Sequence, residues 1–464
     1  MSSKKILFMT GSGDRDIWMY KVGQKLNQQQ DIKCYFIATK EKNLDNLLSL
    51  NVPKENIVFL SALKEKSKPN LAYLRECEKK YDLNIWDIWQ INAERKKSRS
   101  KWNKRKILGY FQYVFKKIEE IVKNIKPDHY LCYGTAGFHA VIINKVLQKN
   151  GVKVIELYPA TIPGRFRLID NLSNIESFLE KEYIENDNKP EQNLAKKFIL
   201  NFQTKPQIHD CSKKYIESFI KKIKKYYSYS FQVLKYRQLP NLNFIFWPII
   251  QKVYDSIGIF EKPKPNEKYV LFPLHYQPEA TTLIYGKWYV DQAALVENIS
   301  KCLPVNYMLY VKEHPFGYGN RKLKFYKRIK RLPNVRLIGP HINNFKLIKN
   351  CSLLATITGT SGWEALLLQK PVITFGDVFY NIFEETKQVK KINELPRIIK
   401  ERLDKKIDFG KLVGFVAAVF KTTYPGLARL PGDCANHSLK DENIKLLARG
   451  IIRYINQLEN VKPN

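Results

Sequence analysis

Short apolar runs that end in glycine, threonine or polar residues recur along the chain, and helical segments separate them. In the first part of the chain these runs lie at residues 5–9, 34–38, 57–60, 130–133 and 152–157. In the later part they lie at residues 269–274, 307–311, 334–338, 352–357 and 371–375. Runs of this length that alternate with helices are typical of buried parallel strands. The pattern therefore predicts an α/β fold.

The alternation is interrupted between residues 171 and 268, where the composition is mostly helical. This stretch ends in Lys262-Pro263-Lys264-Pro265-Asn266, which is typical of a linker. We therefore predict an N-terminal α/β domain with basic helical insertions at residues 1–262 and a second α/β domain at residues 263–400. Residues 401–464 are expected to form a helical segment that packs back on the N-terminal domain, with an irregular stretch at 414–431 and a helix at 441–458.

Four successive strands of the second domain end in residues that can contact a ligand, namely His275, His314, Gly339 and Thr358. In an open parallel sheet, ligands bind beyond the carboxyl ends of the strands. We therefore expect these four residues to meet at one edge of the sheet and to form a binding site there.

The last of these strands leads through Gly359, Thr360, Ser361 and Gly362 into a helix. Glycine permits close backbone approach, and the first turn of a helix has free N–H groups that can bind an anion. The hydroxyl groups of Thr360 and Ser361 add donors for a phosphate, and Glu364 can cap the helix or accept a sugar hydroxyl. The alternative is an ordinary strand–loop–helix unit with a Ser/Thr cap.

Two carboxylates of the N-terminal half follow apolar runs. Glu156 lies at the end of a predicted strand, and Asp170 follows a Pro-Gly turn. Loops beyond strand ends often carry the residues that do chemistry, and paired carboxylates act at the anomeric carbon in glycoside hydrolases. The alternative is structural: Glu156 would cap a loop, and Asp170 would pair with Arg165 or Arg167.

The charge of the chain is strongly basic, with 79 Lys and Arg against 44 Asp and Glu and a formal net charge of +35. This balance favours an anionic partner, for which nucleic acid, anionic lipid and acidic polysaccharide are equally suitable. The segment at residues 213–237 combines lysines with apolar residues at helical intervals. It is either a basic amphipathic helix on an anionic membrane surface or an ordinary helix with exposed lysines.

The seven cysteines are scattered singly, without a C-x-x-C pair. This distribution disfavours a disulfide framework and a zinc site, so we expect reduced thiols and no metal. The sequence shows no signal-peptide core and no uncharged apolar run near twenty residues. We therefore expect a cytoplasmic protein, peripheral on the inner face of the cytoplasmic membrane.

Three motifs resemble, in the same order, those of the bacterial capsule polysaccharide synthesis family, whose members include β-Kdo transferases. They are PLHYQPEATT at residues 273–282, YVKEHP at 310–315 and TGTSGWEALLLQKPVITFGDVFY at 358–380. The resemblance implies a glycosyltransferase of the GT-B type, with two Rossmann-like domains that face each other across a cleft. The domain at residues 263–400 would then bind the nucleotide-sugar donor.

The resemblance also implies residue roles. His314 and Lys312 would contact the donor phosphate, the turn at Thr360 and Ser361 would cradle it, and Glu364 would hold the ribose. His275 and Gln277 would face the cleft, and Glu279 is a further candidate for donor binding. Glu156 and Asp170 look similar to the family's catalytic carboxylates, but the spacing between them is longer and Asn171-Leu172 replaces the usual Lys-Gly.

These observations predict a glycosyltransferase of surface polysaccharide biosynthesis, with no cofactor beyond its donor substrate. CMP-Kdo is the candidate donor, and an anionic glycan or glycolipid is the expected acceptor. A sugar-nucleotide epimerase is a second hypothesis, because that class also has two facing α/β domains. A nucleic-acid-binding protein is a third, based on the charge, although no nucleic-acid motif is present.

Overall fold

The computed structural model describes residues 3–10, 15–29, 31–60, 68–95, 102–134, 137–170, 175–176, 178–185, 189–205, 243–403, 405–428 and 435–460. These residues form two compact units. The first unit contains the described residues of 1–172 and 422–464, and the second contains those of 173–208 and 239–421. The chain therefore returns to the first unit near residue 422, whereas the sequence analysis places its domain boundaries at 262–263 and 400–401. Those boundaries stay a prediction.

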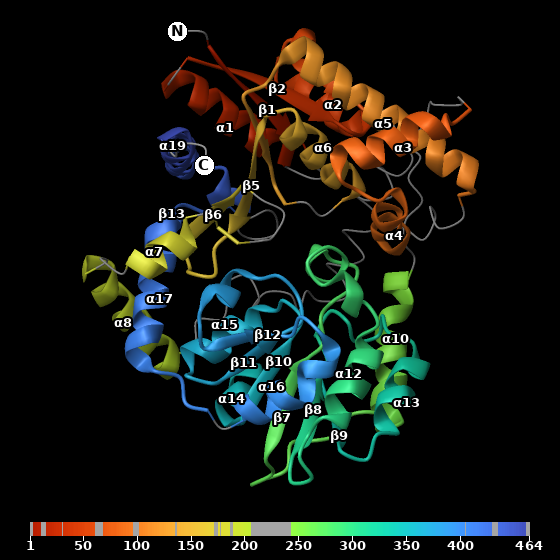
Figure 1. Ribbon diagram of the computed structural model, residues 1–464, viewed down its shortest axis with the longest axis vertical. Coiled ribbons are helices and arrows are strands. Elements are labelled where there is room, and N and C mark those ends of the chain that lie inside the picture. The colour runs from red at the N-terminus through yellow and green to blue at the C-terminus, as the bar shows by residue number, and fades with distance from the viewer. Residues whose placement is uncertain are drawn as a thin grey trace. The chain divides into compact units, whose positions relative to one another are not determined.

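The first unit is built on a seven-stranded sheet with the order β13-β6-β5-β4-β1-β2-β3 (Figure 1). The strands from β1 to β5 are parallel, β6 pairs antiparallel with β5, and β13 pairs antiparallel with β6. Their bounds are β1 Lys4–Met9, β2 Ile32–Ala38, β3 Ile57–Phe59, β4 His129–Cys132, β5 Lys153–Pro159, β6 Arg165–Ile169 and β13 Tyr424–Pro425.

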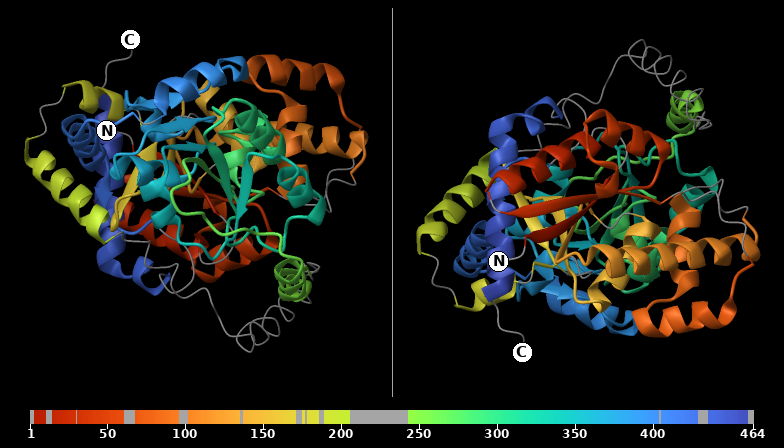
Figure 2. Two further views of the ribbon diagram at one scale, coloured as in Figure 1. Left: turned by 90° about the horizontal axis from the view of Figure 1, so that it is seen from below. Right: turned by 90° about the horizontal axis from the view of Figure 1, so that it is seen from above.

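Helices flank this sheet and supply most of the apolar core of the first unit. Helix α5 is the longest, and its buried face includes Phe111, Phe115 and Ile118. The N-terminal helix α1 and the C-terminal helix α19 lie side by side (Figures 1 and 2). The helices are α1 Arg15–Gln29, α2 Glu41–Ser49, α3 Leu71–Tyr81, α4 Ile85–Arg95, α5 Lys104–Ile125, α6 Phe138–Lys149, α18 Ala435–Ser438 and α19 Asp441–Asn460, with the 3-10 helix η1 Lys54–Asn56.

The second unit is built on a six-stranded sheet that is parallel throughout, with the order β12-β11-β10-β7-β8-β9. The register aligns the carboxyl ends of neighbouring strands, since Pro273 of β7 lies opposite Lys312 of β8, and Lys312 lies opposite Ile338 of β9. The strands are β7 Tyr269–Pro273, β8 Met308–Lys312, β9 Val335–Ile338, β10 Leu353–Thr356, β11 Val372–Thr374 and β12 Thr386–Gln388.

Helices pack against this second sheet over a core of strand residues such as Val270, Phe272 and Val311. The helices described in this unit are α7 Leu179–Glu185, α8 Lys189–Thr204, α10 Asn243–Ser256, α11 Ala280–Leu283, α12 Gln292–Lys301, α13 Leu323–Lys330, α14 Asn344–Asn350, α15 Thr360–Leu367, α16 Leu395–Arg402 and α17 Phe409–Thr422. The described residues of the unit also form the 3-10 helices η3 Lys287–Tyr289, η4 Phe379–Ile382 and η5 Ile392–Glu394.

The predicted α/β class is confirmed, with two units that each contain a mainly parallel sheet, as the GT-B type requires. Four details of the sequence analysis need correction. Residues 165–169 form the antiparallel strand β6, which was not predicted, and Glu156 lies inside β5 rather than at its end. Helix α17 covers residues 414–422 of the stretch at 414–431 that was expected to be irregular, and β12 was not predicted.

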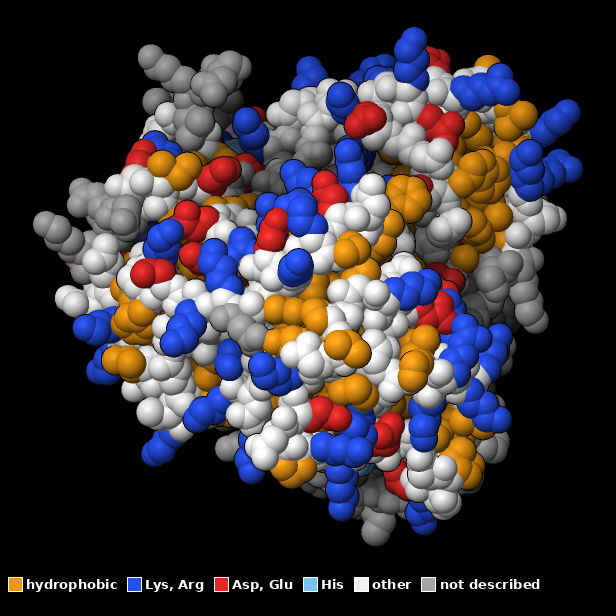
Figure 3. Space-filling view, turned by 60° about the horizontal axis from the view of Figure 1, so that its bottom comes forward, with side chains coloured by type: hydrophobic (Ala, Val, Ile, Leu, Met, Phe, Trp, Pro, Cys, Tyr) orange, Lys and Arg blue, Asp and Glu red, His pale blue; other side chains and the backbone are white. Residues whose placement is uncertain are grey.

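Some expectations fall on residues that the structure does not describe. The basic segment at 213–237 and the glycine turn at 11–13 both lie outside the described residues. Among the helices of the described part, none combines the length and the apolar character that a membrane crossing needs. Figure 3 shows lysine and arginine side chains spread over one face, among acidic and apolar ones.

Candidate functional site

The carboxyl ends of β10, β7, β8 and β9 meet along one edge of the second sheet, because these strands are consecutive parallel neighbours. His275 and His314 follow β7 and β8 by two residues, Gly339 follows β9 directly, and Thr358 follows β10 by two residues. The expected convergence is confirmed by a direct contact across two strands: the Thr358 N–H donates to His275 Nε2 at 3.2 Å.

His275 is one of several buried predicted residues near this edge. It is 8% exposed, and its backbone N–H and carbonyl pair with the side-chain amide of Gln292 at 2.7 and 3.1 Å. Burial, with smaller contributions from His314 and Arg321, lowers the pKa of His275 to about 3. Since Nε2 accepts from Thr358, the neutral ring carries its proton on Nδ1. His275 therefore connects β7 to the turn after β10.

His314 has the chemistry of a phosphate ligand. Its Nδ1 accepts from the Phe316 N–H at 3.1 Å, so its free Nε2 carries the proton. Burial, with Lys312 and Arg321 nearby, lowers the pKa of His314 to about 4. The rings of Tyr276 and Phe316 lie 5.9 and 5.6 Å from the His314 ring, measured between centroids. A neutral imidazole held in this way offers one N–H donor at physiological pH.

Lys312 adds a cation to the same edge. Its side chain is 5% exposed, and Nζ donates to the carbonyls of Glu313 and Pro340, both at 3.3 Å. Burial lowers its pKa to about 8, although Glu313 and Glu364 act in the opposite direction. An ammonium group with two long hydrogen bonds retains a third donor for an anion.

The turn into α15 has the form expected of an anion site. Gly359 is the N-cap residue, and the first-turn N–H groups of Thr360 and Ser361 have no helical acceptor. The Tyr380 hydroxyl donates to the Gly359 carbonyl at 2.6 Å. A Cβ atom on Gly362 would lie 2.3 Å from that hydroxyl, so only glycine fits there.

Glu364 lies one turn into α15, half-buried beside Lys312. Burial raises its pKa to about 7, against the lowering effects of Asn344 and Lys312. Asn344 was not among the predicted site residues, because its sequence position indicates only the start of a helix. Its Nδ2 donates to Ser361 Oγ at 3.3 Å and to the Glu364 carboxylate at 3.2 Å, and so ties the two together.

Three further predicted residues occupy less central positions. Gln277 donates from Nε2 to the Val290 carbonyl at 2.9 Å, which fixes the loop before α12. Glu279 is exposed and precedes the short helix α11, and Thr360 is exposed at the start of α15. Their predicted contacts with a donor stay a prediction.

Sequence reasoning missed a buried ionic network beneath the site. Glu313 is fully buried, and Arg321 Nε donates to its two oxygens at 3.2 and 3.0 Å. Arg321 Nη2 also donates to the His275 carbonyl. Arg321 lies in a basic segment that reads as an exposed helical face, so the sequence gives no signal for this contact.

The two carboxylates of the first unit differ in their surroundings. Glu156 is 1% exposed and accepts hydrogen bonds from Asn144 Nδ2 at 2.8 Å and the Tyr158 hydroxyl at 2.9 Å. Asp170 directly follows β6 and is half-buried. Because Glu156 lies opposite Ile169 in the antiparallel pair, Asp170 is adjacent in space to the middle of β5. Their catalytic assignment stays a prediction.

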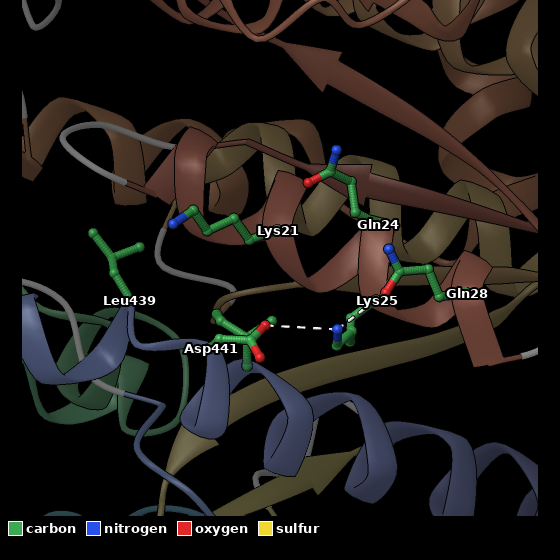
Figure 4. A pocket seen from close by; sticks show the side chains of 7 residues that line it. Lys21, Gln24, Lys25, Gln28, Leu439 and Asp441 are labelled. Atoms are coloured by element: carbon green, nitrogen blue, oxygen red, sulfur yellow. Dashed lines mark hydrogen bonds and ion pairs between the residues drawn. The ribbon is translucent and has the colours of Figure 1, made fainter.

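The first unit also has a recess between α1 and α19, which contains none of the predicted site residues (Figure 4). Lys25 and Asp441 face each other across it, with their charged atoms 3.6 Å apart. In the described part of the chain, no cluster of three or more His, Cys, Asp or Glu side chains has the arrangement of a metal site.

Comparison of the sequence with models of known protein families gives a match. The family model described as "Capsule polysaccharide biosynthesis protein" matches residues 173–408, just over half of the 464 residues. No curated protein matches the chain.

Solved structures show only remote similarity. The β-Kdo 2,7 transferase of KpsC from Thermosulfurimonas dismutans is 14% identical over 73% of this chain and 89% of that one, with a TM-score of 0.35. The corresponding 2,4 transferase is 16% identical over 63% and 79%, with a TM-score of 0.30. The UDP-GlcNAc 2-epimerase of Neisseria meningitidis is 11% identical over 98% and 100%, with a TM-score of 0.26. TM-scores this low carry no argument about function.

The family match includes all three motifs at residues 273–282, 310–315 and 358–380, and with them the strand ends that form the site. The family resemblance predicted from those motifs is therefore confirmed. The chain belongs to the capsule polysaccharide biosynthesis protein family.

Proposed function

We propose that this protein is a glycosyltransferase of capsule polysaccharide biosynthesis, which transfers a sugar from a nucleotide donor to a glycan or glycolipid acceptor. The observation that carries the proposal is the edge of the second sheet, where His314, Lys312 and the first turn of α15 converge. These groups combine an N–H donor, a cation and free backbone N–H groups, which together suit a phosphate. Glu364 and Ser361 beside them suit the hydroxyl groups of a ribose.

CMP-Kdo is the proposed donor because of the family's motifs, and its single phosphate matches the modest charge of this site. Stabilisation of the leaving phosphate would come from preorganised donors, so we expect transfer without an added metal ion. The net charge of +35 favours an anionic acceptor or an anionic membrane surface near it.

Thermal-shift measurements with CMP, UDP, GDP and their sugars test the proposal. A nucleotide at 100 times its Kd should stabilise the protein by about 2.7 kcal/mol. Selective stabilisation by CMP, unchanged by EDTA, supports the CMP-Kdo assignment. Selective response to UDP, with turnover of a UDP-sugar in the absence of an acceptor, would support the epimerase alternative instead. Stabilisation by no nucleotide would contradict both enzymes.

Nucleotide affinity should depend on pH in a bell-shaped manner. Lys312 loses its charge as the pH rises through about 8, and Glu364 loses its charge as the pH falls through about 7. Both charged forms favour the donor, one through the phosphate and the other through the ribose, so the lowest Kd is expected between these values. Titration calorimetry with CMP from pH 5 to 10 measures this profile.

Two variants separate the limbs of that profile. Lys312→Met should remove the alkaline limb, in which affinity otherwise falls about tenfold per pH unit. Glu364→Gln should remove its part of the acid limb and leave only the effect of the phosphate's own ionisation. A wild-type profile that is flat between pH 6 and 9 would contradict the assignment of both residues.

For the chemical step, exposure favours Asp170 over Glu156, because a general base must reach the acceptor. Asp170→Asn should lower kcat about a hundredfold and leave the Kd of CMP unchanged, since the donor residues belong to the second unit. Glu156→Gln, which keeps the shape of the side chain and an acceptor oxygen for one of its two donors, Asn144 or Tyr158, serves as the comparison. If Glu156→Gln lowers kcat and Asp170→Asn does not, the roles must be exchanged.

A further inference from the structure

Two loops that leave neighbouring strands border the candidate phosphate site. One loop starts at His275 after β7, and the other contains His314 after β8. The backbone pairing between these strands extends to the Leu274 N–H, which donates to the Lys312 carbonyl at 2.9 Å. Beyond that point the two loops are connected through side chains.

Arg321 makes this connection with one guanidinium group. Its Nε donates to Glu313, which directly precedes His314, and its Nη2 donates to the carbonyl of His275. The Arg321 side chain is 10% exposed and that of Glu313 is 0% exposed, so both charges are shielded from water. A planar guanidinium fixes the direction of both bonds at once, which an ammonium group cannot do.

The other bonds of Glu313 also hold the second loop. Oε1 accepts from the His314 N–H at 2.6 Å, and Oε2 accepts from the Tyr326 hydroxyl at 2.7 Å. Gly317 closes over the same carboxylate so tightly that a Cβ atom there would lie 2.5 Å from Glu313 Oε1. The position of His314 is thus set by Glu313.

The loop after β7 is hydrogen-bonded to the turn that leads into α15. His275, held at its carbonyl by Arg321, accepts from the Thr358 N–H, and the Thr358 hydroxyl donates to the Thr281 carbonyl at 3.1 Å. We propose that Arg321 and Glu313 are positioning residues whose ion pair sets His314 and the turn into α15 at the spacing that a donor phosphate requires. This inference rests on the proposed function, because it names what aligns that site.

The test compares two identical substitutions in the same region. Arg321→Lys keeps the charge but replaces the planar guanidinium with a single nitrogen, which cannot hold Glu313 and the His275 carbonyl in the same geometry. This substitution should therefore raise the Kd of CMP about tenfold to a hundredfold. Arg328→Lys on α13 is the matched control, since Arg328 is 36% exposed and pairs with Glu297 and Asp291, away from the two loops. The control should bind CMP within about twofold of wild type. Glu313→Gln should act in the same direction as Arg321→Lys and provides a second variant should the first fail to fold.

A readout independent of binding is the ¹⁵N spectrum of the histidine side chains. In the wild type, His275 should show a protonated Nδ1 and an accepting Nε2, and Arg321→Lys should change both this signature and that of His314. Unchanged histidine signals in Arg321→Lys, or an equal loss of CMP affinity in Arg328→Lys, would overturn the inference. If wild-type protein binds no CMP, the proposed donor is wrong, and the histidine signals alone then decide whether Arg321 positions the two loops.

Discussion

Replacing Arg321 with methionine should lower the free energy of unfolding of the second unit by about 3–5 kcal/mol. The substitution leaves the Glu313 carboxylate at 0% exposure with only the Tyr326 hydroxyl and the His314 N–H as donors. A buried charge that loses its ionic partner is strongly destabilising, whereas exposed pairs contribute little. Urea unfolding followed by circular dichroism measures the loss, and amide exchange in β7 and β8 assigns it to this unit.

The control for this prediction is Arg397→Met. Arg397 pairs with Glu401 at 2.6 Å, but both side chains are about half exposed, so the loss should stay within about 0.5 kcal/mol. A second test replaces both members of the buried pair. Arg321→Met combined with Glu313→Leu should recover much of the lost stability, because no isolated charge remains. A single-variant loss below about 1 kcal/mol, or no recovery in the double variant, would show that Glu313 does not depend on Arg321.

The sheet of the second unit was predictable because its strands have a strong local signal. The strands from β7 to β11 are short apolar runs that end near a polar or glycine residue, as at Thr358, whereas the polar strand β12, TKQ, lacks this signal. Parallel strands then force these ends to one edge, so the convergence of His275, His314 and Thr358 followed from the order of the strands alone. That inference did not need side-chain contacts.

Two elements, β6 and α17, were not predicted because they depend on contacts with distant residues rather than on local sequence propensity. The strand β6, RFRLI, follows a Pro-Gly turn and carries two arginines, so its pairing with β5 and with β13, about 260 residues away, was not visible. Helix α17 contains Gly410 and Gly414, which weaken a helix in isolation, but its apolar face packs in the core, where Phe415 and Val416 are 0% exposed.

The missed site residues share one property, which is that their partners are distant in sequence. Arg321 reaches a carbonyl 46 residues earlier, and Asn344 reaches Ser361 and Glu364 17 and 20 residues later. The local sequence around Arg321 indicates only a basic segment, and that around Asn344 indicates only a helix start. Sequence spacing identified the polar residues that gather at the strand ends, but not the distant residues that hydrogen-bond to them.

His314→Ala should lower kcat/KM for sugar transfer about a hundredfold to a thousandfold, the largest loss expected for a single donor-site residue. The reason is the state of the ring: Nδ1 accepts from the Phe316 N–H, and the pKa of about 4 keeps the imidazole neutral at pH 7. In the proposed function, the proton on Nε2 would be a fixed donor for the departing phosphate, where negative charge develops. Loss of that donor should affect kcat more than the Kd of CMP.

Two near-isosteric variants distinguish this role from simple packing. His314→Gln places an amide N–H near the position of Nε2 and should recover about tenfold of the lost activity, since one hydrogen bond to a charged group is worth about 1.5–3 kcal/mol. His314→Asn reaches only the position of Nδ1, so it can satisfy Phe316 but cannot reach the phosphate, and it should be as inactive as alanine. Equal activity of the Gln and Asn variants would mean that His314 stabilises its loop and does not contact the donor. The ranking Gln above Asn, with similar melting temperatures for both, is the result that assigns the Nε2 proton to the phosphate.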